Sequence, residues 1–391
     1  MAKKLRVGIL FGGRSGEHEV SLLSAASILK AIDRRKFEVL PIGITKSGQW
    51  LIADGAQQLL GGESAVLEPG TGATFAEGTE DVETVSAAEA SEDSDLKTTE
   101  AKQIHPHTAL GGQSLDVVFP VLHGTFGEDG TIQGLFELAG IAYVGSGVLG
   151  SAAGMDKDVM KRLFANAKLP IVKHVALLRC DWEKSPRKAI AQIESALKYP
   201  VFVKPANLGS SVGISKAHDR KELGPALTLA AKYDRKLVIE QGVGGKKAKA
   251  REFEVAVLGN DDPKASVVGE IVPFKEFYDY EAKYLTEGSV PVIPAKLSRP
   301  EAKQIREMAV AAFKACDLSG LARVDFLMEP DGNRRIYLNE VNTMPGFTQI
   351  SMYPKLWEAT GIKYRDLITI LIELALERHL EKDRTSYSRE E

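Results

Sequence analysis

The chain has 391 residues, of which 44% are hydrophobic and 26% are charged, and its formal net charge is −3. This length suits two or three domains with buried cores, and the composition is that of a soluble globular protein without a run of apolar residues long enough to cross a bilayer. Its basic residues form no concentrated stripe, which disfavours a nucleic-acid partner.

The first 150 residues are predicted to form a parallel α/β domain. A short apolar run at residues 7–11 stops at a glycine turn, so it indicates a first strand rather than a signal peptide, and we expect a cytoplasmic protein. The segment near residues 62–110 is rich in Gly, Ala, Ser, Thr and Glu, and we expect a mobile acidic insertion there. Low-complexity sequence begins at about residue 53. The expected elements are strands at residues 5–11, 37–45 and 116–122, helices at 17–32 and ending near 140, and a short strand ending at 145.

A compact α+β unit is predicted from residue 151 to residue 236. Its expected helices are at residues 157–167, 186–198 and 221–232, and its strands are at 171–178 and 201–205. The two cysteines, Cys180 and Cys316, match no metal-ligand spacing, so we expect reduced, buried thiols.

The C-terminal domain is predicted to span residues 237–391. It contains a long loop, at about residues 273–295, and long loops in compact domains are usually functional lids. The elements expected around this loop are strands at residues 237–241, 252–258, 265–272, 321–328 and 335–342, a helix at 300–316, and a terminal helix.

The last two strands of this domain are predicted to form an acidic hairpin. If its register centres between residues 332 and 333, Asp325 pairs with Glu340 and Arg323 with Asn342, and all four share one face. Two carboxylates about 4 Å apart repel by roughly 4 kcal/mol at an effective dielectric constant of 20, unless a cation or proton lies between them. Oxygen ligands favour magnesium, so the hairpin is either a magnesium site or a solvated charged face.

A loop rich in small residues follows the strand at residues 201–205. Lys204 lies within an apolar strand, and a lysine there needs an anionic partner. The backbone N–H groups and the hydroxyls of Ser210 and Ser211 could approach phosphate oxygens. No P-loop motif occurs in the chain. The alternative is an ordinary flexible loop.

The segment GSGVLG at residues 145–150 matches the dinucleotide-binding pattern. That fingerprint also requires an acidic residue about 20 positions further on, and residues 168–171 read Lys-Leu-Pro-Ile. The segment is therefore a weak argument for a nicotinamide-dependent dehydrogenase.

Six segments, in their order along the chain, resemble the D-alanine–D-alanine ligases of the ATP-grasp superfamily. Each is a weak signal by itself, but together they cover almost the whole chain. The resemblance implies an N-terminal parallel α/β domain followed by a two-part ATP-grasp fold. The segments are GGRSGEHEVS at residues 12–21, HG at 123–124 with GEDG at 127–130, GMDK at 154–157, KPANLGSSVG at 204–213, FYDYEAKY at 277–284 and NEVNTMPG at 339–346.

The resemblance implies that ATP lies between two antiparallel sheets, one from each of the last two domains. The segment at residues 244–250 is longer than usual for the family, which leaves the register between the adenine-binding and ribose-binding residues open. The ATP-binding residues that the resemblance implies are Lys157, Lys204, Ser211, Glu240, Val243, Glu252 and Lys283.

The resemblance also implies the chemistry. The carboxylate of one D-alanine attacks the γ-phosphate of ATP, and the amine of a second D-alanine then displaces phosphate to form a dipeptide for peptidoglycan precursors. Magnesium, expected as two ions with manganese able to substitute, would be held by Asp325, Glu340 and Asn342. The implied catalytic residues are Glu17, Ser210, Tyr284, Arg323 and Gly346, and the implied substrate-binding residues are His123 and Ser351.

Two other functions of the same fold remain open on the sequence. A D-alanine–D-lactate ligase would share every metal and phosphate element, although the resemblance implies that Tyr284 favours an amine acceptor, because the relatives that form the ester differ in this loop. A nonenzymatic ATP-binding protein would be expected to have lost a metal ligand or a phosphate lysine, and all of these are present. The resemblance further implies a homodimer, with no membrane or nucleic-acid partner.

Overall fold

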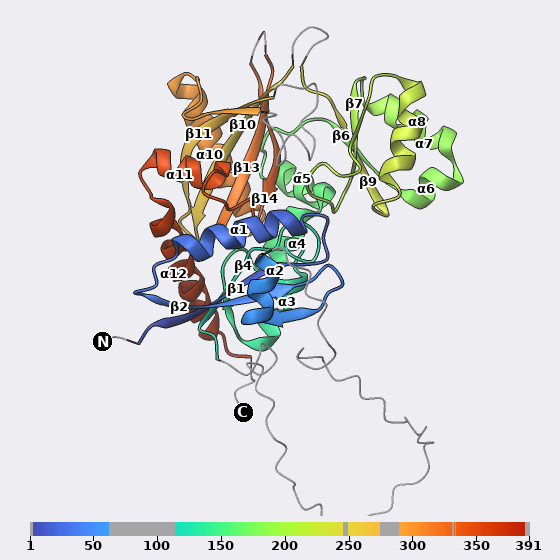
Figure 1. The fold of residues 1–391 in the computed structure, drawn as a ribbon. Coiled ribbons are helices and arrows are strands. Elements are labelled where there is room, and N and C mark those ends of the chain that lie inside the picture. The colour runs from blue at the N-terminus through green and yellow to red at the C-terminus, as the bar shows by residue number, and fades with distance from the viewer. Residues whose placement is uncertain are drawn as a thin grey trace, which may run out of the picture.

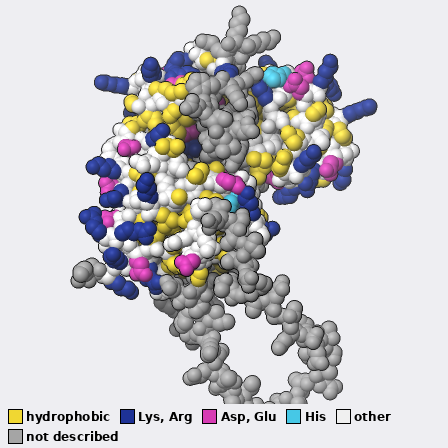
Figure 2. All heavy atoms as spheres, viewed as in Figure 1, with side chains coloured by type: hydrophobic (Ala, Val, Ile, Leu, Met, Phe, Trp, Pro, Cys, Tyr) yellow, Lys and Arg dark blue, Asp and Glu magenta, His cyan; other side chains and the backbone are white. Residues whose placement is uncertain are grey.

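The computed structural model describes residues 3–61, 114–244, 249–273, 289–330, 332 and 334–387. Within them the chain forms three sheets, each with its own helices (Figure 1). The expected acidic insertion at 62–110 lies outside the described residues, as does most of the expected lid at 273–295. No helix of the described part is long and apolar enough to span a membrane. On the face shown in Figure 2, Lys and Arg side chains are interspersed with neutral and acidic ones.

The N-terminal sheet has the strand order β3-β2-β1-β4-β5, and only β3 runs antiparallel to its neighbour. Its central strands are almost fully buried, as expected where helices cover both faces of a parallel sheet. The strands are β1 (Leu5–Gly12), β2 (Phe37–Ile44), β3 (Trp50–Ile52), β4 (Val117–Pro120) and β5 (Ala142–Tyr143), and the helices are α1 (His18–Ala31), α2 (Asp54–Leu60) and α3 (Thr131–Ala139).

Helix α2 corrects one expectation, because the low-complexity sequence was predicted to begin at residue 53. The side chain of Ala56 is fully buried, and Leu59 and Leu60 pack against the core beneath β2. These apolar residues therefore anchor one more helix before the undescribed segment begins.

The central sheet has the order β6-β9-β7-β8, and all its neighbouring strands are antiparallel. Strand β9 was expected at the start of the C-terminal domain, but it pairs with both β6 and β7. Cys180 lies on α6, a helix without buried residues, so its thiol is exposed, contrary to expectation, whereas Cys316 is buried. The elements of this part are α4 (Val148–Met155), α5 (Lys157–Asn166), β6 (His174–Leu178), α6 (Arg179–Lys184), α7 (Pro186–Ala196), β7 (Val201–Pro205), β8 (Ser215–Ala217), α8 (Arg220–Ala230) and β9 (Lys236–Gln241).

The C-terminal sheet has the order β12-β11-β10-β13-β14 and is antiparallel throughout. Strand β12 pairs with β11, so the end of the expected lid belongs to the sheet. The terminal helix is divided in two by a left-handed turn at Gly361. The elements are β10 (Arg251–Gly259), β11 (Lys264–Pro273), β12 (Ser289–Val292), α10 (Arg299–Ala315), β13 (Gly320–Met328), β14 (Ile336–Asn342), α11 (Met352–Thr360) and α12 (Tyr364–Asp383).

The acidic hairpin β13–β14 has the predicted register at its functional end. Asp325 is the partner of Glu340 and Arg323 is the partner of Asn342. Beyond Asp325 the register slips by one residue, so that Phe326 pairs with Leu338 and β14 carries a β-bulge at residues 339–340. The sequence did not reveal this bulge.

The N-terminal and C-terminal sheets share one hydrophobic core. Helices α11 and α12 contribute Tyr353, Leu367 and Leu371 to a buried cluster that also contains Phe119 of β4 and Leu321 of β13. Helix α1 crosses the same junction, between the N-terminal sheet and the C-terminal unit (Figure 1). This shared core fixes the two sheets relative to one another around the pocket described next.

Candidate active site

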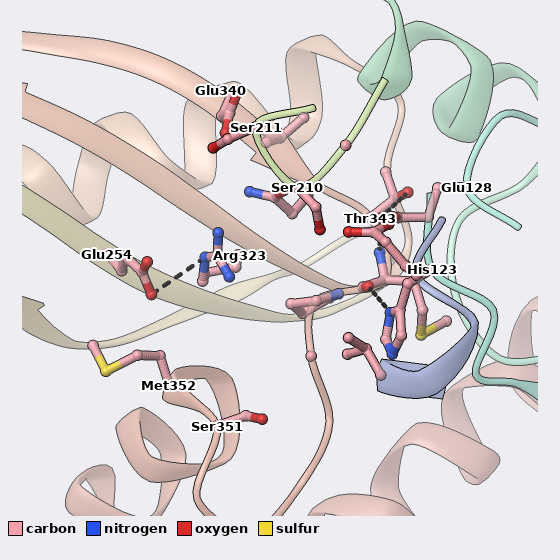
Figure 3. Close-up of a pocket in the computed structure, with 18 of the residues that line it drawn as sticks. His123, Glu128, Ser210, Ser211, Glu254, Arg323, Glu340, Thr343, Ser351 and Met352 are labelled. Carbon is pink, nitrogen blue, oxygen red and sulfur yellow. Dashed lines mark hydrogen bonds and ion pairs between the residues drawn. The ribbon is translucent and has the colours of Figure 1, made fainter. Parts of the chain in front are cut away.

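A pocket of about 370 Å³ is lined by α1, by the loops after β4 and β7 and by the C-terminal sheet (Figure 3). The structure thus brings together side chains that are more than 300 residues apart in the sequence. Of the residues predicted from the sequence, those that line it are Glu17, His123, Lys157, Ser210, Ser211, Arg323, Glu340, Asn342, Gly346 and Ser351.

Glu17 precedes α1 and is buried at one end of this pocket. Its carboxylate is enclosed by glycines, because a Cβ atom at Gly124 would lie 2.5 Å from Oε2 and one at Gly209 would lie 3.1 Å from it. Ser15 holds the local backbone by donating a hydrogen bond to the carbonyl of His123 and accepting one from the N–H of Glu17. A buried carboxylate held in this way can bind an ammonium group of a ligand.

His123 is buried beside Glu17, and burial lowers its pKa to about 4. Its Nδ1 is 2.8 Å from the carbonyl oxygen of Met344, which can only accept a hydrogen bond, so the ring is neutral with its proton on Nδ1. Its Nε2 then accepts from the hydroxyl of Ser24 at 3.0 Å, and that hydroxyl accepts from the N–H of Phe347. Ser24 was missed from the sequence because it lies within the apolar pattern of α1.

Glu128 is a second residue without a predicted role, although it is part of the GEDG segment. Its carboxylate accepts the N–H of Gly124 at 2.7 Å and the N–H of Met344 at 2.8 Å. Burial raises its pKa to about 6. Glu128 therefore joins the loop after β4 to the loop after β14.

The small-residue loop after β7 forms another wall of the pocket. Ser210 and Ser211 have left-handed backbone conformations, with φ angles of 48° and 59°. The buried Oγ of Ser210 has no hydrogen-bond partner among the described residues. Lys157, at the start of α5, donates to the carbonyl of Leu208 at 2.8 Å and so supports the loop. Tyr284 and Lys283, expected to close over this loop, lie outside the described residues.

Lys204 has the anionic partner that its position in an apolar strand predicted. Its Nζ lies 2.9 Å from Oε2 of Glu240, and the Nζ of Lys161 lies 3.1 Å from Oε1 of the same carboxylate. Burial by itself would raise the pKa of Glu240, but the two ammonium groups hold it at about 2. Lys161 was not predicted from the sequence.

The other two residues expected to contact the nucleotide lie beyond this ion pair. Val243 follows β9, and Glu252 lies on β10, and both are partly exposed. Residues 245–248, between Val243 and Glu252, lie outside the described residues. Val243, Glu252, Lys204, Glu240 and Asp325 do not line the pocket themselves.

The floor of the pocket is the charged face of the C-terminal sheet. Arg323 donates from Nε and Nη2 to the two oxygens of Asp325, at 2.8 and 2.7 Å, and Asn342 donates to Asp325 at 3.0 Å. Glu254, opposite Asp325 on β10, lies 3.3 Å from Nε of Arg323 (Figure 3). Three adjacent strands therefore present the carboxylates of Glu254, Asp325 and Glu340 on one face.

Glu254 had a signal in the sequence. The alternation Glu252-Phe253-Glu254-Val255 predicts that the two glutamates share the polar face of β10. Only the pairing of β10 with β13 shows that this face is also that of Asp325.

The far end of the pocket is formed by the loop before α11. Gly346 lies on this loop, and Ser351 is the residue before the helix. The Oγ of Ser351 accepts the N–H of Thr348 at 3.1 Å and is 2.8 Å from the Thr348 hydroxyl. Backbone and hydroxyl donors at a helix start suit an anionic group of a ligand.

The glycine-rich segment at residues 145–150 has a packing role in this structure. A Cβ atom at Gly150 would lie 2.4 Å from the carbonyl oxygen of Asp317, so α4 packs closely against the chain that leads into β13. Ser146 lies in the same contact, 3.4 Å from the carbonyl oxygen of Ser319. The glycines accordingly bring two segments of the protein together.

The architecture and the site define a class. A parallel α/β domain followed by two antiparallel sheets, with lysines and a small-residue loop facing a carboxylate-rich sheet, is the ATP-grasp arrangement. Family descriptions agree with this class, because "D-ala D-ala ligase N-terminus" matches residues 6–146 and "D-ala D-ala ligase C-terminus" matches residues 163–373.

Known proteins resemble the chain over its full length. It is 49% identical over 387 residues to a D-alanine–D-alanine ligase of Natranaerobius thermophilus, covering 98% of both chains, and 51% identical over 392 residues to one of Ruminiclostridium cellulolyticum, covering 99% of both. The D-alanine–D-alanine ligase structure from Coxiella burnetii has a TM-score of 0.75 at 32% identity, covering 98% of this chain and 97% of that one. The structure of the VanG D-Ala:D-Ser ligase from Enterococcus faecalis has a TM-score of 0.75 at 34% sequence identity, covering 95% of this chain and 100% of that one. The chain belongs to the D-alanine–D-alanine ligase family.

Proposed function

We propose that this chain joins two D-alanine molecules in an ATP-dependent reaction that releases ADP and phosphate and supplies a dipeptide for peptidoglycan synthesis. The observation that carries the proposal is the position of Arg323. It lies on the floor of one pocket, between Glu254 and Asp325, with the loop of Ser210 and Ser211 on one side and Ser351 on the other (Figure 3). A cation in that place can stabilise negative charge that develops on an acyl group.

The reaction has two steps. A carboxylate oxygen of the first D-alanine attacks the γ-phosphorus of ATP, the bond to the bridging oxygen breaks, and ADP leaves an acyl phosphate behind. The neutral amine of the second D-alanine attacks the acyl carbon, the bond from that carbon to the phosphate oxygen breaks, and the phosphate leaves with the proton that the amine loses as the peptide bond forms. Because an acyl phosphate is lost to hydrolysis in water, the site must exclude water during the second step.

Each end of the pocket suits one substrate. Glu17 would bind the ammonium group of the first D-alanine, with His123 as the neutral wall beside it. Ser351 would bind the carboxylate of the second, and Arg323 with the N–H of Gly346 would stabilise the tetrahedral oxyanion.

The nucleotide would lie between the central and C-terminal sheets. Lys157 and Lys204 would contact its phosphates beneath the loop of Ser210 and Ser211. Glu240 and Val243 would contact the adenine and Glu252 the ribose. Lys283 and Tyr284 would complete the closed site from the lid, where Tyr284 would share a hydrogen-bond network with Glu17 and Ser210.

The donor set on the charged face of the C-terminal sheet, beside the pocket, fits magnesium. Asp325, Glu340 and Asn342 supply only oxygen ligands, and Asn342 already contacts Asp325. Magnesium is usually bound through one or two carboxylates together with substrate phosphates. When bound, magnesium, as two ions replaceable by manganese, would neutralise charge on the transferred phosphoryl group.

We further propose that the chain has three domains, with the first boundary near residue 150 and the second after β9. We also propose that the protein is cytoplasmic and forms a homodimer. The dimer rests on the family resemblance alone. Light scattering on the purified full chain is expected to give twice the 42.4 kDa chain mass. A mass of one chain across the working concentration range would exclude the dimer.

The reaction is tested by incubating the protein with ATP, magnesium and D-alanine, measuring phosphate release and identifying the product by mass. We expect D-alanyl-D-alanine, formed in equal amount to the phosphate. Absence of dipeptide despite ATP binding would favour the nonenzymatic alternative. In competition assays, D-lactate and D-serine are expected to be poorer acceptors than D-alanine. A preferred ester product would identify a D-alanine–D-lactate ligase.

A further inference from the structure

Lys161 is a fully buried cation to which the proposed chemistry assigns no role. It lies on α5, one turn after Lys157, and its side chain has no exposed surface. Its Nζ is 3.1 Å from Oε1 of Glu240 and donates to the carbonyl oxygen of Asn339, also at 3.1 Å. Burying an ammonium group is costly, and a methionine would fill similar space, so stability alone is a weak reason for a lysine here.

The carbonyl that Lys161 holds belongs to an edge strand. Among the described residues, strand β14 is the last strand of the C-terminal sheet, and on its outer side only an isolated parallel bridge joins Leu338 to Ile171. The segment from α5 towards β6 bonds three backbone groups of β14, on both sides of the bulge. The contacts are Leu338 N–H to Pro170 O at 2.8 Å, Lys161 Nζ to Asn339 O at 3.1 Å, and Val341 N–H to Met160 Sδ at 3.4 Å.

The bulge determines where Glu340 points. Leu338 is fully buried in the core of this sheet, and strict alternation along a strand would direct Glu340 into the same core. The extra residue, Asn339, reverses the alternation, so that Glu340 faces the pocket opposite Asp325. Lys161 bonds the carbonyl of this extra residue.

The same ammonium group also fixes the nucleotide side of the site. Lys161 and Lys204 share the Glu240 carboxylate, one at each oxygen. Glu240 lies near the end of β9 in the central sheet, whereas Asn339 lies on β14 in the C-terminal sheet. Lys161 thus links the two sheets directly. It contacts Glu240, which is proposed to bind the nucleotide, and the carbonyl of Asn339, which precedes the proposed metal ligand Glu340.

We propose that Lys161 is a positioning residue for Mg–nucleotide binding. By holding the β14 bulge and the Glu240 carboxylate at once, it keeps Glu340, Glu240 and Lys204 in the arrangement that a Mg–nucleotide requires. The inference rests on the ATP-dependent part of the proposed function and does not depend on the identity of the acceptor.

The test compares Lys161→Met with Lys236→Met. Lys236 is a partly buried lysine on β9, and its ion-pair partners among the described residues are Asp156 at 2.6 Å and Asp158 at 3.3 Å, neither of which is Glu240 or a residue of β14. Both variants lose a lysine ion pair in the central part of the protein, but only Lys161→Met also loses the contacts to Glu240 and to the carbonyl of Asn339. The readouts are the calorimetric affinity for Mg–ADP, the melting temperature, and the separate KM values for ATP and D-alanine.

Lys161→Met is expected to weaken Mg–ADP binding by roughly tenfold or more, the size of effect that ~1.4 kcal/mol produces. The KM for ATP should rise by a similar factor, while the KM for D-alanine changes by less than about threefold. Lys236→Met should lower the melting temperature and leave Mg–ADP affinity near that of the wild type. Unchanged Mg–ADP affinity in folded Lys161→Met, with only a lower melting temperature, would reduce Lys161 to a structural role and overturn the proposal.

A second variant covers the case in which Lys161→Met does not fold. Lys161→Gln keeps an N–H donor for Asn339 and removes the charge, and it should still weaken Mg–ADP binding. Wild-type affinity in folded Lys161→Gln would overturn the proposal equally. If the wild type binds Mg–ADP but forms no dipeptide, the proposed reaction fails and the Lys161 inference stands.

Discussion

Glu340→Gln is expected to lower turnover by at least about 10³-fold, corresponding to ~4 kcal/mol of transition-state stabilisation. The substitution preserves the shape of the side chain and removes its negative charge. Glu340 faces Asp325 across the hairpin, in the pocket that the lysine-supported loop also lines. A neutral amide there is a much poorer partner for magnesium than a carboxylate. Phosphate release with ATP and D-alanine, measured over a magnesium titration, checks this expectation.

Glu329→Gln is the matched control for Glu340→Gln. Glu329 directly follows β13, and its carboxylate accepts the hydroxyl of Tyr337 at 2.9 Å, outside the pocket. Because glutamine can still accept that bond, this variant should retain nearly full activity. Both variants should melt within a few degrees of the wild type. Near wild-type turnover in Glu340→Gln at saturating magnesium would refute the assignment of Glu340 as a metal ligand.

Arg323→Met is expected to lower kcat by about 10²–10³-fold, as removal of an oxyanion-stabilising donor does in other enzymes. The arginine contributes a bidentate bond to Asp325 and a contact to Glu254. Without its charge, the site loses the cation that contacts Asp325 and Glu254 where the tetrahedral oxyanion is proposed to form. The KM for ATP should change less than kcat, because the loss falls mainly on the transition state of acyl transfer.

Arg251→Met separates the loss of oxyanion stabilisation from the effect of losing a partly buried ion pair. Arg251 lies on the neighbouring strand β10 and makes an equally short bidentate bond to Glu270, at 2.7 Å from both Nε and Nη2. It does not line the pocket. Rapid-quench measurement of acyl phosphate and dipeptide identifies the step that slows. Equal losses of kcat in Arg323→Met and Arg251→Met would argue against a catalytic role for Arg323.

Local patterns were sufficient for most of the fold. The continuous apolar runs of the N-terminal strands, the glycine turn before α1 and the alternation in β13 each reflect interactions within a single element or between sequence neighbours. The predicted hairpin register holds only at the end of the hairpin far from the turn, because the strands next to the turn pair one residue out of that register and the extra residue of the bulge restores it. The bulge at Asn339 was not predicted, although the apolar residues of β14 change phase between Leu338 and Val341. The carbonyl of Asn339 is bonded from α5, 178 residues earlier.

For the site, too, the sequence predicted individual residues but not the contacts between distant elements. The sequence determined which chemical groups were available: the carboxylates of the hairpin, the lysine in an apolar strand and the small-residue loop. It could not show that Ser24 supports His123, that Glu128 joins two loops, or that Glu254 lies beside Arg323, because each contact joins elements far apart in the chain.

Within the described residues, the tertiary structure decided which polar groups meet. The pairing of β10 with β13 placed Glu254 on the face of Asp325, and the packing of α5 against β14 placed Lys161 between Glu240 and Asn339. Periodicity in a sequence reports which face of an element is buried, and hence which residues can pack. The partner across that face depends on how whole elements pack together, and this information exists only once the chain has folded.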